Sequence, residues 1–183
     1  CFKSKEKEAE ISLPMNFFFE CQDKAMVSAT PPSEFADSRF ENFDILIIHP
    51  DFNYKKTITV CTTNNVLERT RQLLLQLDER PVFFFVNSTD IILAMMEQLG
   101  LRDQSAVFCS ADSVDKLKSQ KFSNAHENWE KKYMAKYNWM TSRFYNAMDI
   151  ELNENPNVVM ITDCYIADYT MIDPYMDAVQ IIG

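Results

Sequence analysis

The amino-acid sequence predicts a doubly wound α/β fold built on a mainly parallel sheet. Short apolar runs, each followed by a polar loop, recur along the chain, and such runs are typical of parallel strands covered on both faces. The clearest is the run VFFFV over 82–86, which begins directly after Pro81. Amphipathic stretches of helical length separate the runs, so each strand–helix–strand unit predicts a parallel crossover.

The expected elements follow one another in a regular order. The β-branched and apolar runs predict strands at 24–30, 43–49, 57–62, 82–86, 105–110, 138–140 and 158–162. Apolar periodicity predicts helices at 65–77, 89–99 and 173 onward, one or more helices over 112–136, and a short helix before the last strand. Asn64 or Asn65 is placed to cap the first helix and Ser88 or Thr89 the second, which is expected to stop at Gly100.

Length and composition indicate one ordinary domain with part of another. The chain has 183 residues, of which 46% are hydrophobic, including 14 Phe, and this is ample for a packed core. It contains 2 Gly, far below the average usage of about 7%, which disfavours low-complexity and Gly-rich phosphate-binding architectures. No apolar run approaches the roughly 20 residues that span a bilayer. We therefore expect no membrane association and a cytoplasmic location.

The cysteines and histidines suggest neither a metal site nor a catalytic pair. The five cysteines are widely spread, and no two form a C-x-x-C pair. Several lie in apolar runs, where a free cysteine behaves as a small hydrophobic residue, so reduced and buried thiols are expected. His49 and His126 are isolated in the sequence, and no Ser-His-Asp or Cys-His pattern is present.

The charge of the chain is segregated. The formal net charge of −9 disfavours nucleic-acid binding by the chain as a whole, because phosphates attract Lys and Arg. From Thr141 onward there are seven acidic residues and one basic residue, Arg143. Between Lys116 and Lys136, six Lys stand against two Glu. Any phosphate contact is therefore expected from local groups and not from the overall field.

Four stretches, taken in order, resemble motifs of the superfamily 2 helicases. Ser28-Ala29-Thr30 resembles motif III, and the strand that runs into Asn87-Ser88 resembles motif IV. Thr141-Ser142 with Asp149 resembles motif V, and Gln180 to Gly183 resembles the opening of motif VI, a Q-x-x-G-R-x-x-R pattern. The four occur in the order and at the spacing of that family, and the resemblance covers residues 24–183.

The resemblance implies how the chain is divided and what the whole protein does. Residues 1–42 would be the remnant of a first RecA-like domain, carrying motif III and a linker. Residues 43–183 would be the second RecA-like domain, of the P-loop NTPase fold, ending within motif VI. The whole protein would bind ATP and Mg²⁺ between two such domains and move along a single strand of DNA or RNA. This part alone is expected to be inactive, because the arginines of motif VI follow Gly183 in the family.

Particular residues acquire roles from the same resemblance. Residues that would couple ATP to domain closure are Ser28, Thr30, Asp149, Gln180 and Gly183. Residues that would contact the backbone of the nucleic acid are Asn87, Ser88, Thr89, Thr141 and Ser142. Hydroxyls and main-chain N–H groups suit such contacts because they do not read sequence. The simpler interpretation of the same residues is helix capping. Ala147 departs from the family, which usually has Gly two residues before the Asp.

One basic stretch has two interpretations. Trp129, Tyr133 and Tyr137 recur every four residues, with Lys131, Lys132 and Lys136 around them. On a helix they would form a platform for single-stranded nucleic acid. The favoured alternative is an amphipathic helix that packs its aromatic side chains on the sheet.

A second function remains open at this point. The chain is alternatively a non-catalytic module of RecA-like or Rossmann-like fold that binds other proteins. Its acidity and the alanine at position 147 support this hypothesis. A nuclease or phosphoesterase is disfavoured because the C-terminal acidic residues are dispersed and no His accompanies them.

Overall fold

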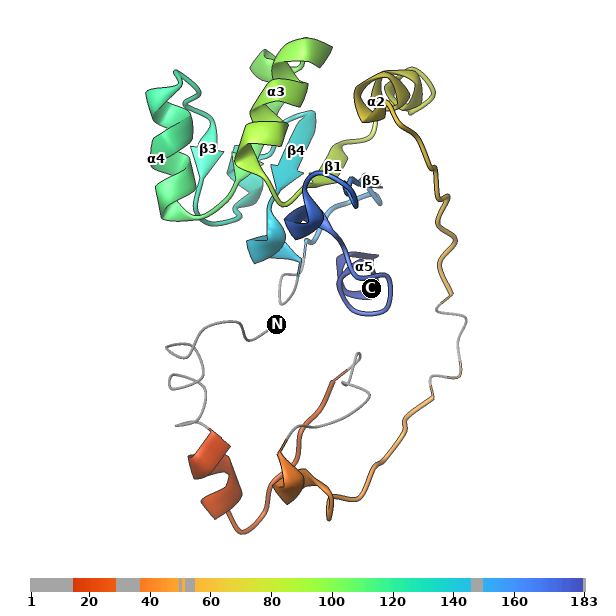
Figure 1. Ribbon diagram of the computed structural model, residues 1–183, viewed down its shortest axis with the longest axis vertical. Helices are drawn as coiled ribbons and strands as arrows, with labels where there is room; N and C mark the ends of the chain where they lie inside the picture. Colours follow the sequence, from red (N-terminus) through yellow and green to blue (C-terminus); the bar gives the residue numbers. More distant parts are fainter. Residues whose placement is uncertain (1–14, 29–36, 50, 52–54, 146–149, 183) are drawn as a thin grey trace. The chain divides into compact units, whose positions relative to one another are not determined.

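The chain consists of two compact units, Cys1–Lys55 and Lys56–Gly183 (Figure 1). The computed structural model describes residues 15–28, 37–49, 51, 55–145 and 150–182. The predicted domain boundary after residue 42 rests on the helicase resemblance, which this division into units does not test.

The first unit is organised by a cluster of phenylalanines. A helix covers residues 15–20, and a 3-10 turn, η1, covers Ser38–Phe40. The ring centroids of Phe19 and Phe40 lie 4.8 Å apart, and Phe18 stacks on Phe43 at 5.9 Å. The guanidinium of Arg39 lies 4.0 Å from the centre of the Phe19 ring. The aromatic contacts therefore tie together two segments about 20 residues apart in sequence.

Three predicted strands are wrong for the residues that the structure describes. Residues 24–28, 43–49 and 57–62 form no strand. The aliphatic side chains of Ile45, Leu46, Ile47 and Ile48 are 69% to 84% exposed. A β-branched run becomes a strand only when a neighbouring strand takes up its main-chain hydrogen bonds and a packed face buries its side chains. In the described residues of these three segments, no strand pairs with the main chain, and most side chains are exposed.

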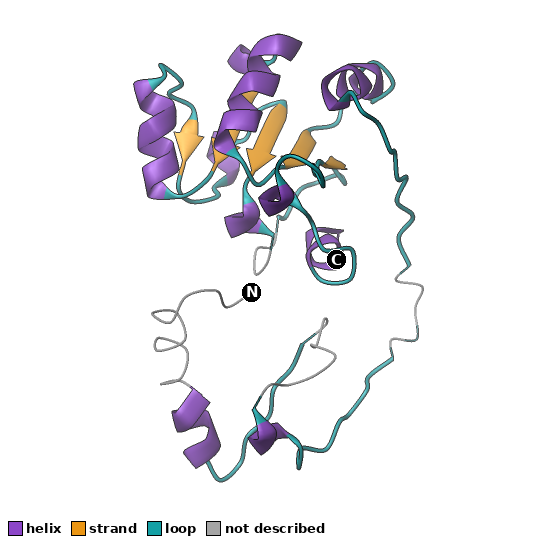
Figure 2. Cartoon of the chain, viewed as in Figure 1, coloured by secondary structure: helices purple, strands orange, loops and turns teal. Residues whose placement is uncertain are grey.

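The second unit is built on a five-stranded sheet in which every pairing is parallel (Figure 2). The strand order is β3-β2-β4-β1-β5. The strands are β1 Val82–Phe85, β2 Ser105–Phe108, β3 Ala125–His126, β4 Tyr137–Met140 and β5 Asn157–Met160. The predicted fold class, a doubly wound and mainly parallel α/β sheet, is confirmed.

Two of the helices of the second unit begin at side-chain caps. The α-helices are α2 Val66–Leu74, α3 Thr89–Leu99, α4 Ala111–Ser119 and α5 Asp177–Ile182, and the 3-10 turns are η2 Arg102–Gln104, η3 Lys131–Tyr133, η4 Ser142–Phe144 and η5 Asp168–Thr170. Asn65 caps α2 by accepting the N–H of Glu68 at 3.0 Å. Gly100 ends α3 in the left-handed region, at φ +69°, as predicted.

The first face of the sheet carries the larger core. Helices α2, α3 and α4 pack there against alternate residues of the strands, Phe84 and Trp139 among them. The Phe84 and Trp139 rings stack at 4.1 Å, and both side chains are completely buried. The indole N–H of Trp139 donates to the hydroxyl of Ser105 on β2, at 3.1 Å. Three adjacent strands are thus joined through side chains on this face.

The second face is covered by 3-10 turns, irregular segments and α5. Phe83, Phe85, Phe108 and Met140 point to this face, and Ile181 of α5 packs against them. The loop before β4 contributes Trp129, whose ring lies 5.4 Å from Phe83 and 4.9 Å from Phe108. Both faces are covered, which explains the continuous apolar run of β1.

The helix expected over 112–136 is wrong beyond Ser119. After α4 the chain turns at Lys121, whose φ is +62°, and enters β3. Trp129, Tyr133 and Tyr137 therefore do not share one helical face. Trp129 packs on the sheet, and Tyr133 stacks on His126 at 3.8 Å. The favoured alternative, in which the aromatic side chains pack against the sheet, is correct for Trp129, although a loop and not a helix brings it there.

The thiols follow the prediction only in part. Cys109, at the end of β2, is completely buried, and burial raises its pKa to about 11. Cys61 and Cys164, in contrast, are exposed, and both are free. Position within an apolar run predicts burial only where that run becomes a strand, as at Cys109.

Short helices are a feature of this fold. The longest one described, α3, has 11 residues. In the part of the chain that the structure describes, no helix combines the length and the apolar character needed to cross a membrane.

Replacement of Phe84 by alanine should destabilise the second unit strongly. The substitution removes a ring with no exposed surface and leaves a cavity beside Trp139, and such changes cost about 3–5 kcal/mol. Urea unfolding followed by tryptophan fluorescence measures the effect. Leu75→Ala is the matched control, because Leu75 is 83% exposed and its removal should cost little. Equal losses for the two variants would contradict the described core.

Candidate functional site at the carboxyl edge of the sheet

The two central strands diverge at their carboxyl ends. After β1 the chain passes into α3 on the first face, whereas after β4 it passes into η4 on the second face. β1 and β4 are direct neighbours in the sheet. A point at which neighbouring parallel strands send their connections to opposite faces forms the crevice where open α/β sheets usually bind ligands. The candidate site lies at this point.

Asn87 bridges the two sides of this crevice. Its side-chain oxygen accepts the main-chain N–H of Ser142 at 3.2 Å. Its amide nitrogen donates to the carbonyl of Tyr169 at 2.8 Å, in the loop after β5. The register pairs Phe85 with Met140, so two residues later Asn87 and Ser142 stand opposite each other. One side chain thus links the end of β1 to the start of η4 after β4 and to η5 in the loop after β5.

The start of α3 carries Ser88 and Thr89. The hydroxyl of Ser88 accepts the N–H of Ile91 at 3.3 Å, so Ser88 is the N-cap of α3. Both residues are half-buried. Asp90 in the first turn forms an ion pair with Lys116 of α4 at 2.6 Å. The predicted capping role of Ser88 is confirmed. The N-terminal end of α3 lies at the same edge of the sheet as Asn87.

Thr141 is turned toward the sheet. Its side chain is 9% exposed, and its hydroxyl lies 3.4 Å from the carbonyl oxygen of Phe108. Good O–H···O hydrogen bonds measure about 2.5–3.0 Å, so this contact is weak. Ser142, by contrast, is exposed. Of these two hydroxyls, that of Ser142 is accessible to a ligand. The Thr141 hydroxyl becomes accessible only after a rotation about χ1.

Of the other predicted residues, the structure describes Gln180 and Ser28. Gln180 lies on α5, half-buried, next to Ile181 on the second face. Ser28 belongs to the first unit, where it is exposed. Thr30, Asp149 and Gly183, together with Ala147, lie outside the described residues.

Charge near the crevice is balanced and not strongly positive. Arg143, which follows Ser142, forms an ion pair with Glu127 at 3.3 Å. No Lys, Arg or His occurs between Phe144 and Gly183. A phosphate in the crevice would therefore be held by hydroxyls and N–H groups, with one arginine that already has a carboxylate partner.

Tyr145 lies at the end of η4 with an unsatisfied hydroxyl. Its side chain is 4% exposed, and among the described residues its hydroxyl has no hydrogen-bond partner. Burial, followed by the nearby Asp177, raises the pKa of Tyr145 well above its usual range. The group is consequently a neutral phenol buried below the crevice.

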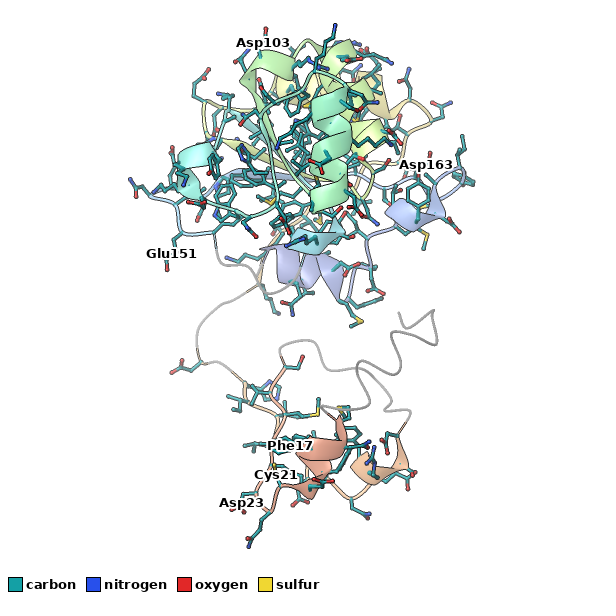
Figure 3. The ribbon with its side chains drawn as sticks, turned by 90° about the vertical axis from the view of Figure 1, so that its left-hand side faces the viewer. Phe17, Cys21, Asp23, Asp103, Glu151 and Asp163 are labelled. Carbon is teal, nitrogen blue, oxygen red and sulfur yellow. The ribbon has the colours of Figure 1, made fainter. Side chains whose placement is uncertain are left out.

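The loop after β5 was missed by the sequence analysis. Figure 3 labels Asp163, whose main-chain N–H donates to the hydroxyl of Thr170 at 2.8 Å. The Asp163 carboxylate accepts the N–H groups of Tyr165 and Ile166, each at 2.9 Å. These bonds lower the pKa of Asp163 below its usual range. The available signal was the position of Asp163 directly after an apolar strand, where parallel sheets collect functional groups.

A pocket of about 260 Å³ lies beside this loop. It is formed by the start of α2, the inner side of α3 and the residues that follow β1 and β5. Seven of its eleven lining residues are apolar, and Asp163 and Gln98 are among the polar ones. The pocket is on the first face, to one side of Asn87, and none of the predicted site residues lines it.

Within the described ranges, no group of three or more His, Cys, Asp or Glu side chains is arranged to hold a metal ion.

Comparison of the chain with protein-family models, with curated proteins and with solved structures found no match. The assignment of function consequently rests on the residues and the geometry described above.

Replacement of Asn87 by alanine should loosen the crevice. Two hydrogen bonds of a half-buried amide are lost, each worth about 0.5–1.5 kcal/mol, so we expect about 1–3 kcal/mol of lost stability. Hydrogen exchange should report faster exchange of the Ser142 amide. Asn128→Ala, at an exposed position, should change neither quantity. Unchanged Ser142 exchange in Asn87→Ala would disprove the bridge.

Acid should destabilise the loop after β5 through Asp163. Because its pKa is lowered in the folded state, its contribution is complete above the unfolded pKa, about 3.9, and is lost as the pH falls through the folded pKa. The free energy of unfolding should therefore fall more between pH 5 and pH 2 for the natural protein than for Asp163→Asn. Parallel pH profiles of the two proteins would refute this role.

Proposed function

We propose that this chain is the second RecA-like domain of an ATP-dependent nucleic-acid helicase or translocase, preceded by the end of the first such domain. Its role in the whole protein is to bind a single strand of nucleic acid through the sugar-phosphate backbone and to complete an ATP site between domains. The whole protein would act in the cytoplasm, where exposed thiols such as those of Cys61 and Cys164 stay reduced.

One observation carries this proposal. The motif IV-like and motif V-like stretches lie 54 residues apart in sequence, from Asn87 to Thr141, yet they meet across adjacent parallel strands. Asn87 is hydrogen-bonded to Ser142 at the point where ligands of open α/β sheets bind. The resemblance implies that these two motifs contact the same strand of nucleic acid. Their proximity at this edge of the sheet supports that implication.

The chemistry of this edge suits a nucleic-acid backbone. The Ser142 hydroxyl, the Thr89 hydroxyl and the N-terminal end of α3 are compact donors that do not distinguish between bases. The weak contact of Thr141 with Phe108 leaves its hydroxyl able to rotate toward a phosphate at little cost. Because neutral donors and one arginine that is already paired with Glu127 neutralise few phosphates, we expect binding of the backbone to be weak and only slightly dependent on salt.

The described residues fit ATP and Mg²⁺ only in part. Gln180 is the single member of the predicted ATP-coupling set that lies in the described part of the second unit. Within the described ranges no group of three or more His, Cys, Asp or Glu side chains that could hold a metal ion occurs, and Mg²⁺ bound together with ATP needs only one or two carboxylates beside the phosphates. No step of the reaction is therefore assigned to either group.

The second candidate function is a protein-binding module of the same fold. The surface that favours it is the loop of residues 163–177, which carries exposed tyrosines and four aspartates. The two functions differ in one measurable property, nucleic-acid-stimulated ATP hydrolysis by the full-length protein.

The test compares ATP hydrolysis by the full-length protein with and without single-stranded DNA and RNA. We expect stimulation by one of the two polymers. Thr141→Val, which keeps the shape of the side chain but removes its hydroxyl, and Asp149→Ala should each lower the stimulated rate at least tenfold, or about 1.4 kcal/mol. The expected loss reflects the contact that each side chain makes with the strand or with the nucleotide.

Ser123→Ala is the matched control, since it removes an exposed hydroxyl away from the crevice and should leave the stimulated rate unchanged. Circular dichroism verifies that each variant is folded. Lack of stimulation by either polymer would reject the helicase proposal and favour the protein-binding module.

A further inference from the structure

The pocket beside the loop after β5 has the size of an anchor site for one or two side chains. Its volume of about 260 Å³ is just below the range of about 300–1,000 Å³ that is usual for sites of complete small ligands. Its walls include Val66 and Leu67 from α2 and Ile91 and Met95 from α3. An aliphatic side chain suits these walls.

The rim of the pocket continues into an exposed apolar surface. Tyr165 is 98% exposed and Ile166 is 90% exposed, and both follow Asp163 at the rim. Tyr169 and Met171 are also largely exposed. Tyrosine and methionine are enriched at the centres of protein interfaces, and an apolar surface of this kind extends beyond what a small ligand covers. The occupant is therefore a segment of polypeptide.

The loop is held in shape before any partner arrives. The carboxylate of Asp163 binds the N–H groups of Tyr165 and Ile166, and that of Asp173 binds those of Tyr175 and Met176. Such local turns fix the main chain that carries the exposed side chains. A preorganised surface pays less conformational entropy on binding.

The charge of the surface selects the partner. Residues 163–177 contain four aspartates and no Lys, Arg or His. Exposed carboxylates next to exposed tyrosine rings favour a lysine or arginine, through charge attraction and through contact of the cation with the ring face. The same carboxylates repel phosphates, which disfavours a nucleotide or a nucleic acid at this position.

We propose that the pocket and the loop of residues 163–177 form a docking site for a segment of a partner protein, in which an aliphatic side chain enters the pocket and an adjacent lysine or arginine lies on the loop. This site adjoins the crevice through the hydrogen bond from Asn87 to Tyr169, but neither Asn87 nor Ser142 lines the pocket, and the proposal does not depend on the proposed helicase function.

The test uses the full chain and a phage-displayed library of random dodecapeptides. We expect the selected peptides to share an aliphatic residue within two positions of Lys or Arg. The consensus peptide is then synthesised with a fluorescent label, and its binding is followed by fluorescence anisotropy. Ala94→Phe, which fills the pocket from α3, and Asp168→Lys, which reverses a charge on the loop, should each weaken binding at least tenfold.

Two matched controls keep the chemistry and change the place. Ala111→Phe adds the same ring at an exposed alanine of α4, and Glu154→Lys makes the same charge reversal before the start of β5. Both should keep the affinity within twofold. Asp168 is exposed, so its variant tests the site even if Ala94→Phe is not stably folded.

Three results would overturn the proposal. The first is a selection without a shared aliphatic and basic pattern. The second is binding that is unchanged in a folded Ala94→Phe and in Asp168→Lys. The third is displacement of the peptide by ATP or by a single-stranded oligonucleotide at a concentration matched to its affinity, which would assign the pocket to a nucleotide.

Discussion

The register between β1 and β4 determines where the candidate functional groups of the second unit lie. Phe84 pairs with Trp139 and Phe85 with Met140, and the stacked Phe84 and Trp139 rings hold this alignment. A shift by one residue would turn every side chain of β4 to the opposite face and bury the wrong set. The same alignment places Asn87 opposite Ser142. The packing of the core and the position of the crevice therefore both depend on the pairing of β1 with β4.

The polar residues of the candidate site follow the strands because β1 is buried along its whole length. A strand such as β1 has no position for a polar side chain, so polar groups appear only after its last buried residue. Asn87 follows β1, Thr141 follows β4 and Asp163 follows β5. Main-chain and side-chain hydrogen bonds join these three strand ends, through Asn87 to Ser142 and to Tyr169. The edge therefore acts as a single connected surface with two different characters, a hydroxyl-lined crevice and an acidic, aromatic loop.

Several predicted strands and helices are wrong because a local sequence pattern forms such an element only when another part of the chain packs against it. The aliphatic run at 43–49 has the composition of a strand but remains exposed, because a strand is stable only within a sheet. The four-residue spacing of Trp129, Tyr133 and Tyr137 suggested a helix. The chain instead turns at Lys121, and packing on Phe83 and Phe108 decides the position of Trp129. Periodicity reports which side chains prefer burial, and it does not report which element buries them.

The sequence by itself determined the parallel α/β class, the buried strand at 82–86, the limits of α3 and the clustering of polar residues after strands. These features are local, since they depend on apolar runs, on the Ser88 cap and on the left-handed conformation of Gly100. Tertiary structure alone decided the strand order, the meeting of Asn87 with Ser142, the inward rotation of Thr141 and the pocket beside Asp163. These depend on contacts between residues far apart in sequence, and the free energy of such contacts is set by packing that no local pattern encodes.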